Sequence, residues 1–203
     1  MTAPGAIARG PALGVIESSS IARGVVVADA ALKQSPALLV HMRAVSGGKH
    51  LVILEGGVAE IGYAMIAARA AAGDRLVDSL ELAAADPQVW PMLGASNDPT
   101  LGYGVAGRDW SDDRGAEAVA IVEVGTVCAA LAAADAACKC TEVTVRDVRL
   151  AVDLAGRAFF TLTGTLDAIQ AAADAASAAA GPHVLGLEII AQPAPELRGR
   201  LFR

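Results

Sequence analysis

The sequence contains an internal repeat, and this repeat limits the possible folds more than any other feature. Ala12-Leu-Gly-Val-Ile-Glu17 returns in the second half of the chain as Ala118-Val-Ala-Ile-Val-Glu123. At the same offset in residue number, Ala28-Asp-Ala-Ala31 returns as Ala134-Asp-Ala-Ala137. Because such matches keep their order through both halves of the chain, the sequence is predicted to hold two copies of one folding unit.

The offset between the two copies changes once along the chain. Further along each copy, Gly48-Lys49 matches Gly156-Arg157, at an offset that is longer by two positions. Gly56 and Gly164 keep this longer offset. Two extra residues are therefore expected in the second copy, between Arg149 and Gly156.

Each copy has the pattern strand, helix, strand, strand, helix, strand. In the first copy the expected strands cover 13–17, 37–45, 50–54 and 76–82, and the expected helices cover 21–34 and 58–72. In the second copy the expected strands cover 119–124, 143–151, 158–163 and 184–190, and the expected helices cover 126–139 and 166–180. Serines at 18–20 are candidate N-caps, and Gly73 and Gly181 mark helix ends. The order predicts an α+β fold of two tandem ferredoxin-like βαββαβ domains.

The boundaries between the parts follow from composition. Residues 94–116 are rich in Gly, Asp, Ser and Pro, which is typical of a linker or surface loop. We therefore expect a first domain at 1–93 and a second domain with a C-terminal tail at 117–203. Within the first domain, Asp86-Pro87-Gln88 is expected to start a short helical turn that ends near Leu93.

Composition excludes several classes of protein. The net charge is −6, and no long uninterrupted run of apolar residues occurs, so neither a nucleic-acid partner nor a membrane span is expected. Three cysteines without a secretory signal fit the reducing cytosol. The mean hydropathy of +0.48 comes largely from alanine. This apolar surplus indicates surface that is buried between subunits.

With both copies laid out, the sequence resembles bacterial microcompartment shell proteins, in the tandem form that carries two such domains in one chain. The resemblance rests on Ala12–Glu17, on the helix that ends Ala28-Asp-Ala-Ala-Leu-Lys33, and on the glycine loop at 46–49. It extends over about residues 12–93 and 117–195. The element order is unpermuted, as in the propanediol-utilisation type.

The resemblance implies a structural role and no enzymatic activity. Three chains would form a homotrimeric, pseudohexagonal tile with a central pore for small metabolites, in the shell of a cytoplasmic microcompartment. Other shell proteins, hexameric and pentameric, would be its partners. Lys33 and Lys139 match the lysine at the tile edge. The expected pore-lining residues are Val45, Ser46, Gly47, Gly48, Val152, Asp153, Leu154 and Ala155.

Four basic residues flank the expected pore loops, namely Arg43, Lys49, Arg149 and Arg157. They could form a solvated face, or they could place positive charge near the pore. In a trimer each charge would occur three times, and a narrow opening focuses the field. The second reading predicts a preference for small anions. Glu17 and Glu123 occupy equivalent strand ends, where capping or interface hydrogen bonds are expected.

Two other functions remain open from the sequence. Some relatives carry a pore-loop cysteine, and three copies of it hold an iron–sulfur cluster that relays electrons. This sequence has Ser46 in that loop, so we expect no cofactor and no metal. The other alternative is a soluble regulator that binds a small ligand on a tandem ferredoxin-like fold. No constellation of base, nucleophile and oxyanion donors supports an enzyme.

Overall fold

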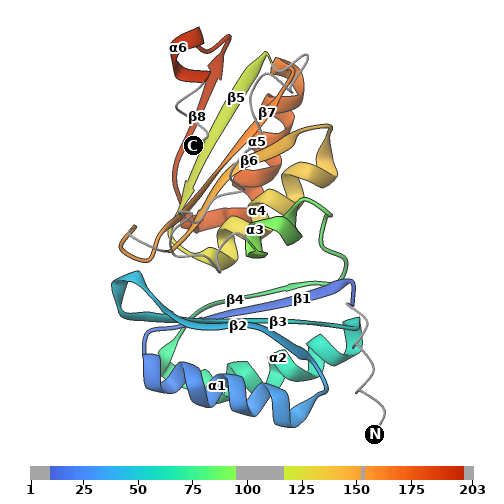
Figure 1. Cartoon of the computed structure of the whole chain (residues 1–203), viewed down its shortest axis with the longest axis vertical. Helices are drawn as coiled ribbons and strands as arrows, with labels where there is room; N and C mark the ends of the chain where they lie inside the picture. The colour runs from blue at the N-terminus through green and yellow to red at the C-terminus, as the bar shows by residue number, and fades with distance from the viewer. Residues whose placement is uncertain (1–9, 95–116, 152–153, 199–203) are drawn as a thin grey trace, which may run out of the picture. The chain divides into compact units, whose positions relative to one another are not determined.

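The computed structural model describes residues 10–94, 117–151 and 154–198. The chain divides into two compact units, Met1–Ala85 and Asp86–Arg203. Each unit has a four-stranded antiparallel sheet with two long helices packed against it (Figure 1). The α+β fold and the βαββαβ order expected from the repeat are confirmed in both copies.

The first unit is built from β1 (Ala12–Ser18), α1 (Ile21–Gln34), β2 (Leu38–Val45), β3 (Lys49–Gly56), α2 (Val58–Ala72) and β4 (Leu76–Leu82). Its strands lie in the order β2-β3-β1-β4, so β2 and β4 are the edges of the sheet. The helices α1 and α2 pack against each other and cover one face of this sheet (Figure 1).

The second unit repeats this arrangement with β5 (Ala118–Val124), α4 (Val127–Cys140), β6 (Thr144–Leu150), β7 (Ala158–Gly164), α5 (Leu166–Ala180) and β8 (Val184–Ala191). Its sheet has the order β6-β7-β5-β8, which is the order of the first sheet element for element. Two short helices complete the unit. One, α3 (Val89–Gly94), precedes β5, and the other, α6 (Pro195–Arg198), follows β8.

Hydroxyl side chains and glycines set the ends of the helices. Ser20 accepts a hydrogen bond from Arg23 N at 3.3 Å at the start of α1. Thr126 accepts one from Ala129 N at 3.0 Å at the start of α4. Such caps satisfy amide groups that the first helical turn leaves without a partner. Gly73 ends α2 with a φ of 55°, a value that favours glycine.

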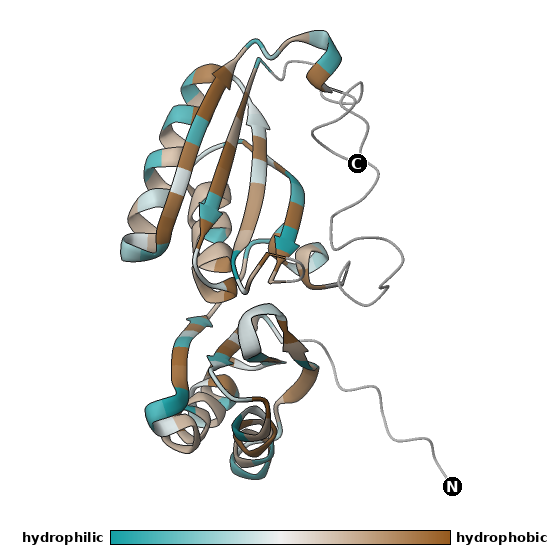
Figure 2. Ribbon diagram, turned by 90° about the vertical axis from the view of Figure 1, so that its left-hand side faces the viewer, coloured by the Kyte–Doolittle hydropathy of each residue, from teal (hydrophilic) through white to brown (hydrophobic). Residues whose placement is uncertain are grey.

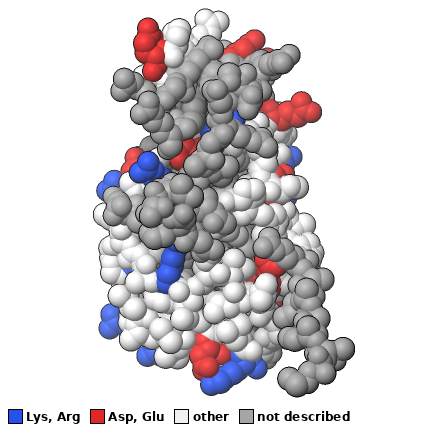
Figure 3. All heavy atoms as spheres, viewed as in Figure 1, with Lys and Arg blue, Asp and Glu red and all other residues white. Residues whose placement is uncertain are grey.

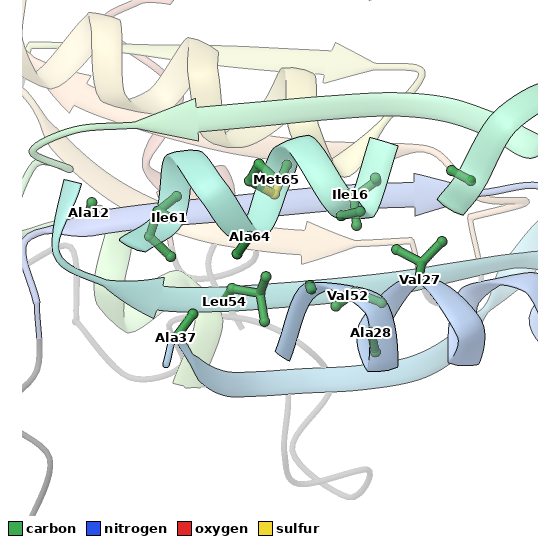
Figure 4. Close-up of a cluster of buried hydrophobic side chains, with 13 residues drawn as sticks. Ala12, Ile16, Val27, Ala28, Ala37, Val52, Leu54, Ile61, Ala64 and Met65 are labelled. Carbon is green, nitrogen blue, oxygen red and sulfur yellow. The ribbon is translucent and has the colours of Figure 1, made fainter. Parts of the chain in front are cut away.

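Small side chains form much of the core of the first unit. The cluster between the helices and the sheet consists of Ala12, Ile16, Val27, Ala28, Ala31, Ala37, Val52, Leu54, Ile61, Ala64, Met65, Ala68 and Ala72 (Figure 4). Alanines on both helices let them approach the sheet closely. At Gly14 of β1, a Cβ would lie 2.9 Å from the sulfur of Met65. In Figure 2 the strands carry long hydrophobic bands, whereas the helices mix pale turns with hydrophilic ones.

The structure divides the chain at Ala85, earlier than the boundary at residue 93 expected from the sequence. The short helix α3 lies beside α4 and therefore belongs to the second unit (Figure 1). The reason is tertiary contact, because Val89 and Leu93 are buried and Asp86 N donates to Asp135 Oδ1 at 2.7 Å. The rest of the expected linker, 95–116, lies outside the described residues.

Charged side chains are scattered over the face of the molecule shown in Figure 3, singly or in small mixed groups. None of the helices in the described part of the chain is both long enough and apolar enough to cross a membrane.

Candidate functional site

The first expected pore loop is the tip of the hairpin between β2 and β3 (Figure 1). Ser46–Gly48 form a single 3-10 turn, in which Gly47 and Gly48 have φ values of 76° and 72°. A Cβ on Gly48 would meet nothing within 4 Å, so the backbone conformation, and not space, calls for glycine. Both glycines are exposed, and Val45 beside them is buried.

An ion pair holds the residue that follows this loop. Lys49 Nζ lies 3.3 Å from Glu17 Oε2, and the two side chains are only 16% and 0% exposed. Glu17 is near the end of the central strand β1 and pairs in register with Leu51 and Asp78. The pair therefore fixes the loop to the sheet, and Glu17 neutralises the charge of Lys49.

The second expected pore loop connects β6 and β7 and is longer. Ala151 N donates to Arg157 O at 2.9 Å, and Arg157 N donates to Leu154 O at 2.9 Å. Ala151 and Ala155 have φ values of 62° and 52°, which cost non-glycine residues about 1 kcal/mol each. Leu154 is half-buried and Ala155 is exposed. The other two expected pore residues, Val152 and Asp153, lie outside the described residues.

The ion pair of the first loop recurs at the second loop, but closer to solvent. Arg157 Nη1 lies 3.2 Å from Glu123 Oε1, with side chains 57% and 46% exposed. A cavity of about 500 Å³ opens beside the loop, lined by Ile121, Glu123, Leu154, Ala155, Arg157, Ala158 and Phe159. Most of these side chains are apolar, so the cavity offers a single charged pair on an otherwise apolar wall.

The remaining two basic residues lie on the hairpin strands. Arg43 is half-buried on β2, opposite Leu51 of β3. Arg149 is exposed on β6, and its guanidinium carbon lies 6.0 Å from the centre of the Phe159 ring, within range of a cation–π interaction. Of the four basic residues that flank the loops, Lys49 and Arg157 are thus balanced by glutamates.

The two expected edge lysines lie in the last turns of α1 and α4. Lys33 Nζ is 2.7 Å from Asp29 Oδ2, and Lys139 Nζ is 2.7 Å from Asp135 Oδ2. Both are i,i+4 pairs, with an exposed carboxylate at Asp29 and a buried one at Asp135. Lys33 is 75% exposed and Lys139 is 47% exposed, so each head group can reach a neighbouring molecule.

The cysteines do not fit an iron–sulfur cluster at the loops. All three lie on α4, with Cys128 buried, Cys138 half-buried and Cys140 exposed. A helix rises about 1.5 Å per residue, so Cys128 and Cys140 are about 18 Å apart along α4. Burial, with Asp86 and Asp135 nearby, raises the pKa of the Cys138 thiol to about 12, which disfavours the thiolate that binds metals.

Comparison with protein families decides which family these two units represent. The model of the BMC domain matches residues 12–85 and again residues 118–193. The chain belongs to the BMC domain family. The two matches coincide with the two repeats, and each spans a complete βαββαβ set.

Known microcompartment proteins are similar to this BMC chain over most of its length. It is 34% identical over 170 residues to the bacterial microcompartment shell protein PduT of Citrobacter freundii, covering 84% of this chain and 85% of PduT. A solved microcompartment protein from Desulfitobacterium hafniense superposes with a TM-score of 0.72 at 27% identity, covering 93% of this chain and 98% of that one. A fused permuted hexameric shell protein of the RMM microcompartment shares the fold, with a TM-score of 0.56, 21% identity, and 83% and 82% of the two chains covered.

The repeated ion pair is the feature that reasoning from the sequence missed. Glu17 and Glu123 were expected to cap strands or form interface hydrogen bonds, and Lys49 and Arg157 were assigned separately to the pore flank. The structure joins them as Lys49–Glu17 and Arg157–Glu123. A signal was present, because acid and base are each retained in both repeats, with the base following the acid at nearly the same spacing.

Proposed function

We propose that this BMC chain is a structural shell protein of a bacterial microcompartment and forms one third of a homotrimeric, pseudohexagonal tile. The presence of two complete BMC domains in one chain carries this proposal. Two domains per chain supply six domains per trimer, which is the number needed for a six-sided tile. The likeness to PduT over 85% of that shell protein supports the same role.

In this proposal the two hairpin loops line a central pore for small metabolites. Residues 46–48 form the turn of the first hairpin directly after Val45, and in the sequence 152–155 lie between β6 and β7 of the second copy. Glycine and alanine at these tips leave backbone groups accessible to a passing solute. Each loop is held at its base by a Glu–Lys or Glu–Arg pair, which suits a pore of fixed shape.

The exposed lysines at the ends of α1 and α4 are proposed to join neighbouring tiles. Their aliphatic stems can pack along an adjoining surface while the ammonium groups bind carbonyl or carboxylate oxygens. Tiles that meet at these edges, together with hexameric and pentameric shell proteins, would enclose the compartment in the cytoplasm. The chain then works through assembly, and we propose no enzymatic activity for it.

The test of this function separates trimer formation from sheet formation. Size-exclusion chromatography with light scattering should give a trimer of the 20.4 kDa chain, and electron microscopy should show sheets or tubes. Replacing Lys33 and Lys139 together by alanine should leave the trimer intact and reduce the order of the sheets. Sheets of undiminished order from the double variant would contradict the edge role, and a monomer would contradict the tile.

Neither alternative function gains support from the site. An electron-relay role needs a cysteine in the loops, which have none. A purified protein without visible absorption would agree with this. A soluble regulator would form discrete oligomers only, so the same micrographs distinguish it from a shell tile.

A further inference from the structure

The segment that follows β4 covers one side of α4. Asp86 N donates to Asp135 Oδ1 at 2.7 Å, and Gln88 Nε2 lies 3.5 Å from Cys138 Sγ. The residues of α3 that come next, Val89, Met92 and Leu93, are buried. We call the surface around Asp135 and Cys138 the covered side of α4.

The same segment also forms hydrogen bonds with the edge strand β6. Gln88 Nε2 donates to Val143 O at 2.9 Å, and Gln88 Oε1 accepts from Val145 N at 2.9 Å. One side-chain amide thus bonds two backbone groups, in both directions, at the end of an edge strand. These two hydrogen bonds fix where the segment lies along β6, in addition to the apolar contact made by α3.

The equivalent surface of the first unit, on α1, is exposed to solvent. Asp29 and Leu32 of α1 are the repeat equivalents of Asp135 and Cys138. Asp29 has a side chain that is 57% exposed, against 8% for Asp135. Leu32 is 38% exposed, and two further apolar residues of α1 are also exposed, Ile21 at 51% and Val25 at 46%. The helix therefore presents an apolar strip beside an acidic acceptor.

The second copy contains an equivalent of the segment that covers α4, and this equivalent is also exposed to solvent. At the longer of the two repeat offsets, Pro87, Gln88 and Val89 correspond to Pro195, Glu196 and Leu197 of α6. Like α3 after β4, α6 follows the last strand of its sheet. Val89 is fully buried, whereas Leu197 is 40% exposed. Among the described residues, the apolar strip of α1 in the first unit is therefore exposed, and so is the short helix α6 after the last strand of the second unit.

We propose that the C-terminal segment from Ala194 through α6 of one copy binds the Asp29 side of α1 in the next copy, as 86–94 binds α4 within the chain. The inference rests on the proposed trimer, because three such head-to-tail contacts close a ring. Ala194 N, the equivalent of Asp86 N, donates to the Asp29 carboxylate. Leu197 packs against Leu32 and Val25.

Only one of the two hydrogen bonds that Gln88 forms with the edge strand can be repeated in this contact. Glu196 replaces Gln88, and an ionised carboxylate accepts hydrogen bonds but donates none. It can accept from Leu39 N of the edge strand β2, the equivalent of Val145 N. It cannot donate to Ala37 O, the equivalent of Val143 O. The Glu196→Gln variant should therefore bind more tightly than the parent chain.

Disulfide trapping tests which chain supplies the segment. The pair Leu32→Cys and Glu196→Cys, in a background with Cys138→Ala and Cys140→Ser, should give covalent dimers and trimers on a non-reducing gel after mild oxidation. Gln88→Cys with native Cys138 is the positive control, because it should form a disulfide inside one chain with no gain in mass. Ile66→Cys with Glu196→Cys is the negative control, since Ile66 is 61% exposed on α2.

Trimer dissociation provides a second measurement that does not depend on cysteines. Glu196→Gln should lower the dissociation constant about fivefold, the effect of one added hydrogen bond. Leu197→Asp should raise it by about tenfold or more. Trimers with no Leu32–Glu196 crosslink and no response to these variants would overturn the inference and leave the tile proposal intact. A crosslink confined to one chain would also overturn it, whereas a monomeric parent chain would overturn both.

Discussion

Lys49 Nζ lies 3.3 Å from Glu17 Oε2, so the first residue after the hairpin loop is tied to the central strand of its sheet. Arg157 and Glu123 repeat the contact in the second copy at 3.2 Å. The two pairs differ in their surroundings, because Glu17 is fully buried and Glu123 is 46% exposed. Equivalent residues therefore contribute differently to stability in the two repeats.

Removing the cation should cost far more stability in the first copy. In Lys49→Met a buried carboxylate loses its lysine, and we expect the free energy of unfolding to fall by about 3 kcal/mol. Arg157→Met leaves Glu123 in contact with water and should cost less than about 1 kcal/mol. Urea unfolding of the two variants measures the difference. Equal losses would mean that burial does not distinguish the pairs, and Lys49→Arg serves as the control that keeps the charge.

The charge of the second loop can be changed in either direction. Glu123→Gln leaves the positive charge of Arg157 unbalanced, and a trimer would carry three such charges near the pore. Flux of small anions relative to matched cations through reconstituted shells should rise. Arg157→Gln should lower this ratio, and the double variant should return it to the parental value. A ratio that is the same in all four proteins would contradict the assignment of these residues to the pore flank.

Two helix glycines should respond to alanine in opposite ways. A Cβ at Gly24 of α1 would collide with the imidazole of His50, so Gly24→Ala should destabilise the protein by about 1–3 kcal/mol. A Cβ at Gly62 of α2 would meet its nearest neighbour, Glu81 Oε2, at 4.0 Å. There alanine fits, and the better helix propensity should add about 0.5–1 kcal/mol. Thermal unfolding should show the two changes with opposite signs; a gain from Gly24→Ala would contradict the close contact.

His50 should make stability depend on pH just below neutrality. Burial lowers the pKa of its imidazole below 6.5, and its Nδ1 has no hydrogen-bond partner among the described residues. The unfolded chain then takes up a proton before the folded one does. The free energy of unfolding should therefore fall as pH drops through 6.5, until the folded imidazole is protonated as well. His50→Gln should flatten the slope between about pH 7.5 and 5.5; an unchanged slope would assign it to other groups.

The thiols of α4 should differ in reactivity. The pKa of Cys138 is raised to about 12, so its thiolate is scarce in mildly alkaline buffer, and Cys128 is buried. Cys140 is exposed at the end of the helix. Iodoacetamide at about pH 8 should label Cys140 first, as read by peptide mass spectrometry. Unfolding in urea should make all three react, and equal labelling in the native protein would contradict the burial of Cys138.

Local sequence signals were sufficient for most of the secondary structure. The helices 21–34, 58–72 and 166–180 begin and end as expected, because a hydroxyl or glycine precedes each one and serine or glycine follows it. The hairpin turn at 46–48 was also confirmed, since it needs glycines with positive φ. These features depend on interactions between residues that are close in the sequence.

Contacts between distant residues were the part that sequence could not supply. The placement of α3 in the second unit depends on contacts of this segment with residues far away in the sequence, such as the bond that Gln88 donates to Val143 O and the bond that it accepts from Val145 N. The joining of Glu17 to Lys49 depends on the register of β1 against β3. Local sequence propensities do not indicate either contact, although the internal repeat draws attention to residues that take part, such as Glu17 and Lys49.

The attachment of α3 to α4 has a consequence for how an assembly of these chains would respond to dilution. Because residues 86–94 are covalently joined to the unit they cover, their effective concentration at α4 stays constant at any protein concentration. The equivalent contact at α1 would be lost once free chains become scarce. Dilution should therefore open only one of the two kinds of junction, so that a ring of three separates into intact single chains.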